Sequence, residues 1–76
     1  MRAEDLRQLL RRQPFQPFRV HVSDGTSYDV THPEIVTVGP GAIRISIPPS
    51  RLPGYPVERL VLVSLLHIAR VEIFVP

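Results

Sequence analysis

The chain has 76 residues, a formal charge of +2 and no cysteine. This length leaves room for one domain, residues 1–76, and excludes a second. Without cysteine the chain forms no disulfide, no thiolate metal site and no thiol nucleophile. A domain this small has a marginal core, which oligomerisation often supplements. We therefore expect one domain that depends on apolar packing and on contacts with other subunits.

Residues 1–13 predict a short N-terminal helix. Leu6, Leu9 and Leu10 recur at helical spacing and form a narrow apolar stripe. Acidic residues stand in the first turn and arginines in the last, which suits the helix dipole. Pro14 disfavours helical backbone at the residue before it. Because a helix of this length is unstable alone in water, we expect its leucines to pack on the rest of the fold.

The segment FRVHVSDGTSYDV, residues 18–30, predicts a β-hairpin. A three-residue turn, Ser23 to Gly25, with the glycine in the left-handed region, gives the hairpin one apolar and one polar face. The expected cross-strand partners are Phe18 and Val30, Val20 and Tyr28, His21 and Ser27, and Arg19 and Asp29. The last pair is typical of an ordinary charge pair on a sheet surface.

The next segment predicts a bent second strand that pairs with a third. Pro33 cannot donate to a strand ladder, so we expect a bend or bulge at residues 31–34. The strand resumes at residues 35–38, a turn follows at the sequence GPG, and residues 42–47 form the third strand. The expected partners are Val38 and Ile43, and Val36 and Ile45.

The second half of the chain predicts a proline-rich loop at residues 48–58 and two further strands. The sequence RLVLV, residues 59–63, is apolar on both faces, and residues 64–67 form a one-turn connection to a strand at 68–75. The fold class is therefore mostly β: an N-terminal helix, then a five-stranded, strongly bent antiparallel barrel of the Sm or SH3 type over residues 18–75.

This arrangement resembles the Sm-like barrels, in particular the bacterial host-factor RNA chaperones (Hfq). The resemblance rests on the helix, the DG hairpin, the bent second strand and the final LVLVSLLHIARVEI. It implies a ring of subunits and RNA binding. Leu66 stands where that family carries a lysine, so only His67 is carried over as an RNA-contacting residue. The pattern PFxPF, DG and HPE also resembles small bacterial proteins without an assigned activity.

An excess of apolar residues predicts self-association. Some of these residues fall on faces opposite the expected core faces, and large exposed apolar patches are uncommon on monomers. The expected interface residues are Ile35, Tyr55, Val61, Val63 and Phe74. We expect a homo-oligomer, with a ring possible, in which the strand at Leu60–Val63 pairs with the strand at Val71–Val75 of a neighbour. The alternative is a monomer covered by the helix and the proline-rich loop.

Nucleic-acid binding, with RNA as the partner, is the alternative function. Arginine side chains contact phosphates without reading sequence, and four of the arginines lie within the first helix segment. The candidate residues are Arg7, Arg11, Arg12, Arg44 and His67. The solvated face of an ordinary helix explains the same pattern.

Enzymatic chemistry receives little support. No serine lies in a recognisable nucleophile elbow, the acidic residues are scattered, and there is no glycine-rich phosphate loop. His21, Asp29 and His32 are residue types that bind metals, but their spacing is not diagnostic and ordinary sheet surface is the preferred interpretation. We therefore expect a structural or protein-interaction module with no catalytic residues, no metal, no cofactor and no small-molecule substrate.

The sequence also predicts the compartment. No apolar run near the N-terminus is typical of a signal peptide, and no stretch reaches the roughly 18 apolar residues of a membrane-spanning helix. We expect a cytoplasmic protein without a membrane partner.

Overall fold

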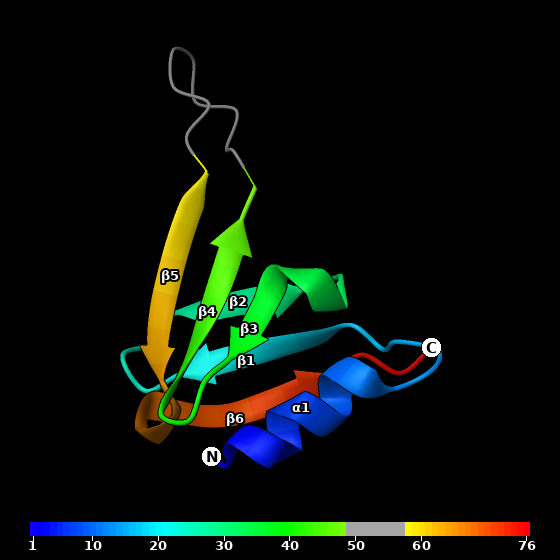
Figure 1. Ribbon diagram of the computed structural model, residues 1–76, viewed down its shortest axis with the longest axis horizontal. Coiled ribbons are helices and arrows are strands. Elements are labelled where there is room, and N and C mark those ends of the chain that lie inside the picture. Colours follow the sequence, from blue (N-terminus) through cyan, green and yellow to red (C-terminus); the bar gives the residue numbers. More distant parts are fainter. Residues whose placement is uncertain (49–57) are drawn as a thin grey trace.

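The computed structural model describes residues 1–48 and 58–76 and shows a mostly β domain with an N-terminal helix (Figure 1). Most of the predicted loop at 48–58 therefore lies outside the described residues. No helix in the described part is long and apolar enough to cross a membrane. The elements are α1 (Ala3–Arg11), β1 (Phe18–Val22), β2 (Ser27–Val30), η1 (Pro33–Ile35), β3 (Val36–Val38), β4 (Ala42–Ile47), β5 (Arg59–Ser64), η2 (Leu65–His67) and β6 (Ile68–Ile73).

The strands form two three-stranded antiparallel sheets, ordered β2-β1-β6 and β3-β4-β5. The predicted hairpin register is confirmed, with Phe18 opposite Val30 and Arg19 opposite Asp29. Gly25 adopts φ +92° in the turn, as the bulged three-residue hairpin requires. The predicted partners of β3 and β4 are confirmed as well. Short turns therefore fixed both registers.

The prediction of five strands was wrong, because the second strand is divided. A 3₁₀ helix, η1, separates β2 from β3 at Pro33, and the two pieces lie in different sheets. Proline has no N–H for a ladder and fixes its own φ, so it starts a helical turn here instead of only bending a strand. Among residues 1–48 and 58–76, no strand pairing closes the two sheets into a barrel.

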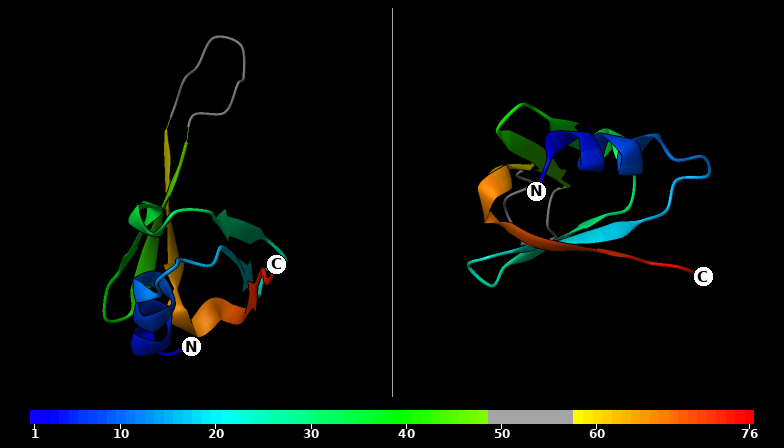
Figure 2. Two further views of the ribbon diagram at one scale, coloured as in Figure 1. Left: turned by 90° about the vertical axis from the view of Figure 1, so that its right-hand side faces the viewer. Right: turned by 90° about the horizontal axis from the view of Figure 1, so that it is seen from below.

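One apolar core lies between the sheets and the helix. Leu6 of α1 is fully buried, and α1 lies beside β3 (Figure 2). The isolated helix would not be stable, so this anchor holds it in place. Every described strand and η2 also contribute side chains to this core. The buried core side chains are Leu6, Phe18, Val20, Val30, Val36, Ile43, Ile45, Val63, Leu65 and Ile68.

We predict that Gly25→Ala lowers the free energy of unfolding by about 1–2 kcal/mol, because an L-residue is strained at positive φ. A methyl group at Gly25 would meet no atom within 4 Å, so the cost is conformational and not steric. Gly41→Ala is the matched control, since that position is equally open and has no positive φ. Urea unfolding of both variants tests this. An equal effect of the two substitutions would contradict the prediction.

Candidate interaction surface

Each sheet has two outer strands with one edge that no described strand covers: β2 and β6 in one sheet, β3 and β5 in the other. β5 pairs only with β4, and β6 pairs only with β1 (Figure 1). An uncovered edge presents unpaired N–H and C=O groups, and proteins usually protect it with charge, proline or a bulge. From Leu60 to Ser64, β5 has none of these in its sequence. Of the other outer strands, β2 and β6 carry charged residues, and β3 is uncharged but only three residues long. From Leu60 to Ser64, β5 is therefore the longest uncharged edge among the described strands.

The ladder fixes which backbone groups of β5 face outward. The N–H of Leu65 donates to the carbonyl of Gly41 at 3.0 Å, continuing the β4–β5 ladder by one residue. Because hydrogen-bonded and non-hydrogen-bonded pairs alternate in antiparallel sheets, Val61 and Val63 direct their backbone groups to β4. Leu60 and Leu62 then direct theirs to the open edge.

The same reasoning applies to β6. The N–H of Phe74 donates to the carbonyl of Pro17 at 3.0 Å, which continues the β1–β6 ladder. Glu72 therefore bonds toward β1, and the backbone groups of Val71 and Ile73 face the open edge. The side chains of Val71 and Ile73 pack against the core and are only half-buried.

The exposed apolar side chains are partly those that the sequence predicted. Leu60 is 58% exposed, Leu62 is 73% exposed and Leu66 is 89% exposed. The strand predicted to pair with a neighbour includes Leu60 and Leu62, but neither leucine nor Leu66 was among the expected interface side chains. Val63, named as an expected interface residue, lies in the core at 5% exposure. Its partner is Ile43, a core residue, and this register turns the neighbouring leucines outward.

The other predicted interface residues are dispersed. Ile35 and Val61 are half-buried against the core. Phe74 is 40% exposed, and the Arg19 guanidinium carbon lies 5.3 Å from its ring centroid. Tyr55 lies outside the described residues.

The candidate nucleic-acid residues do not form one described cluster. Arg7 and Arg11 lie 3.9 and 3.6 Å from Glu4, which offsets their charge. Arg12 donates to Gln16 at 2.7 Å. Arg44 is exposed on β4, and His67 lies in η2 with its Nδ1 3.4 Å from the hydroxyl of Ser23. RNA binding through these residues stays a prediction.

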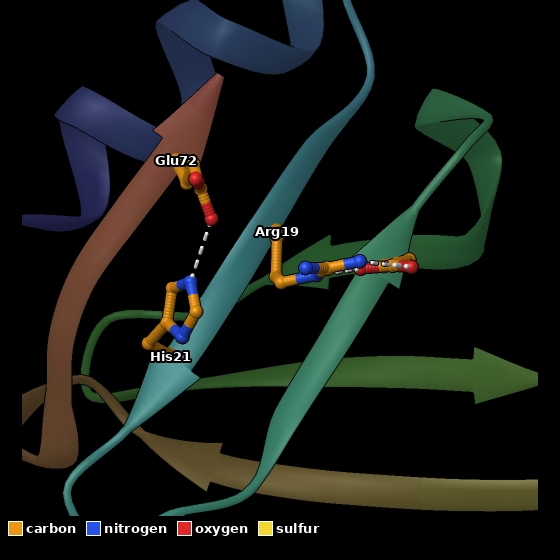
Figure 3. Close-up of polar contacts among 4 residues, drawn as sticks. Arg19, His21 and Glu72 are labelled. Carbon is orange, nitrogen blue, oxygen red and sulfur yellow. Dashed lines mark hydrogen bonds and ion pairs between the residues drawn. The ribbon is translucent and has the colours of Figure 1, made fainter. Parts of the chain in front are cut away.

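The outer face of the β2-β1-β6 sheet carries two cross-strand polar pairs (Figure 3). Arg19 Nε donates to Asp29 Oδ1 at 2.6 Å, as the predicted register requires. His21 Nε2 donates to Glu72 Oε1 at 3.0 Å and so joins β1 to β6. These hydrogen bonds lower the pKa of Asp29 and the pKa of Glu72 below their ordinary values, since they stabilise the ionised carboxylates.

The candidate metal ligands are engaged separately. His21 bonds to Glu72, Asp29 bonds to Arg19, and His32 Nδ1 lies 3.1 Å from the hydroxyl of Thr31. Within the described ranges, no group of three or more histidine and acidic side chains is placed to hold a metal ion. The polar face of the hairpin therefore consists of cross-strand pairs.

Comparisons with models of protein families, with curated proteins and with solved structures gave no match. The structure defines a small β-rich domain with an N-terminal helix and six described strands in two three-stranded sheets. Its function is therefore argued from its own residues.

We predict that acid destabilises the protein through Asp29 and Glu72. A lowered pKa in the folded state gives stability that is present above the unfolded-state pKa, about 4, and is lost as the pH falls through the folded-state value. Between pH 7 and pH 2, the melting temperature of the Asp29→Asn, Glu72→Gln double variant should therefore fall less than that of the wild type. Thermal unfolding across this range measures it. Parallel curves for the two proteins would contradict the prediction.

Proposed function

We propose that this chain is a non-enzymatic, self-associating structural or protein-interaction module, in which β5 of one copy pairs with β6 of another. The observation that carries the proposal is the edge of β5. It combines unpaired backbone groups with two exposed leucines and lacks charge from Leu60 to Ser64. An uncharged apolar edge is a template for adding a strand.

The alternation of backbone groups favours β6 as the partner edge. In an antiparallel junction, a residue whose N–H and C=O face the open edge lies opposite a residue of the partner strand whose N–H and C=O also face its open edge. The side chains of two such opposite residues lie on the same face of the joined sheet. Leu60 and Leu62 would therefore lie beside Val71 and Ile73 of the second copy. This contact covers two exposed leucines and the half-buried edge of the neighbour's core at once.

A junction of β5 with β6 joins two different surfaces. Such a heterologous contact leaves one free edge of each kind at the ends, so assembly proceeds until a ring closes or a filament grows. The strand order is that of an Sm-like barrel if β2 and β3 count as halves of one bent strand. This correspondence supports an open barrel of the Sm or SH3 type and a closed ring.

We predict a native mass that is a multiple of the 8.6 kDa subunit by light scattering coupled to gel filtration. Leu62→Lys should weaken association at least about tenfold, because it removes apolar burial and adds a charge to the junction. The matched control is Thr37→Lys, which adds the same charge to the same sheet at β3, next to Arg44. A monomeric wild type at high concentration would overturn the proposal.

A backbone substitution separates strand pairing from side-chain packing. Leu62→Pro removes an N–H that faces the open edge and spares the ladder to β4, so the subunit should stay folded and become monomeric. Val61→Pro removes an N–H that faces β4 and should destabilise the subunit itself by about 3 kcal/mol or more. Gel filtration and thermal unfolding distinguish the two. Assembly that survives Leu62→Pro would show that β5 is not the paired edge.

A further inference from the structure

The uncovered edge of β2 borders a groove in the described part of the chain. The groove has a volume of about 770 Å³ and is lined by residues of β2, η1, the end of β4 and the start of β5. Ser27, Tyr28 and Asp29 of β2 line it, together with Ile45 and Ile47 of β4. Arg59, the first residue of β5, lines the groove, but none of the four junction residues Leu60, Leu62, Val71 and Ile73 does.

The backbone of β2 directs hydrogen-bonding groups to the uncovered edge that borders this groove. The N–H of Val22 donates to the carbonyl of Thr26 at 2.9 Å, and this bond sets the alternation along the hairpin. Tyr28 and Val30 therefore bond toward β1, whereas Ser27 and Asp29 direct their N–H and C=O groups outward. A strand laid along the groove would find these groups unpaired.

The lining combines apolar surface with an excess of negative charge. Tyr28, Ile35 and Ile47 are half-buried and offer apolar contact. The carboxylates of Glu34 and Glu58 line the groove and form no ion pair with a described residue. The carboxylate of Asp29 already forms an ion pair with Arg19.

The cations of the groove do not balance these carboxylates. Arg59 is the one arginine among the described lining residues, and His32 is the one histidine. Charge complementarity therefore favours a basic occupant.

We propose that this groove binds an extended, basic peptide segment of another protein by adding it as a strand to β2. The peptide backbone pairs with Ser27 and Asp29. Side chains alternate along an extended strand, so one set packs on Tyr28, Ile35 and Ile47. Arginine or lysine side chains of the other set reach Glu34 and Glu58. Strand addition with side-chain pockets is a recurrent way of binding peptides.

The test uses a fluorescent peptide of about eight residues, a typical strand length, with alternating arginine and valine. An acidic version with glutamate for arginine is the control probe. We expect the basic peptide to bind, the acidic one not to bind, and amide NMR shifts to concentrate in β2 and η1. Shifts confined to β5 or β6, or equal binding of both peptides, would overturn the proposal.

Matched variants separate the two parts of the site. Glu34→Gln and Glu58→Gln should each weaken binding by about two- to fivefold, the scale of an exposed ion pair. Ser27→Pro removes an N–H at the free edge and should abolish binding, whereas Ser27→Ala keeps the donor and should bind normally. Melting temperatures verify that each variant is folded. Wild-type affinity for the basic peptide in Ser27→Pro, or in a variant that carries both Glu34→Gln and Glu58→Gln, would contradict the strand-addition model.

Assembly does not confound this test, because it depends on other edges. The Leu62→Lys variant, whose substitution lies outside the groove, should bind the basic peptide with unchanged affinity. If that variant lost the peptide as well, the groove would depend on the junction, and the proposal of an independent site would be overturned.

Discussion

The structure depends on one small apolar core to which every strand must contribute. The ten buried side chains come from α1, η2 and all six described strands. In 76 residues no element has a core of its own, so losing one layer exposes the others. Each strand therefore buries the side chains of one face in the core. The side chains on the opposite faces determine which surfaces of the domain are polar and which are apolar.

Those opposite faces differ between the two sheets. In the β2-β1-β6 sheet they carry cross-strand polar pairs, Arg19 with Asp29 and His21 with Glu72, which water solvates well. In the β3-β4-β5 sheet the outer face changes from polar on β3 and β4 to apolar on β5, where Leu60 and Leu62 stand. The same core thus supports one face suited to solvent and one strand suited to a partner.

Much of the fold could be predicted wherever a short turn links two strands. Three residues around Gly25 fix the β1–β2 register, and the turn of Gly39 to Gly41 fixes the β3–β4 register. The register of β4 against β5 could not be predicted from the sequence, because the eleven residues 48–58 separate the two strands and a connection of that length does not determine which residues pair. Without that register, the sequence did not distinguish the buried Val63 from the exposed Leu62. Pro33 signalled a bend, but a local rule does not say which sheet the chain enters next.

The candidate sites were less accessible to sequence reasoning. Residue type identified Arg7, Arg11 and the histidines, yet their neighbours in space decide their chemistry, as Glu4 does for both helix arginines. The groove beside β2 depends on the separation of two sheets. No sequence motif encodes that distance, because it arises from the packing of side chains far apart along the chain.

The backbone alternation on β5 has an evolutionary consequence. The positions that face the open edge, Leu60 and Leu62, are also the positions that the core does not use. Natural variation at these two sites is therefore released from the selection that maintains folding. Under the proposed junction, a single codon change at either site would alter the quaternary structure of a lineage, while the ancestral tertiary structure would be inherited unchanged.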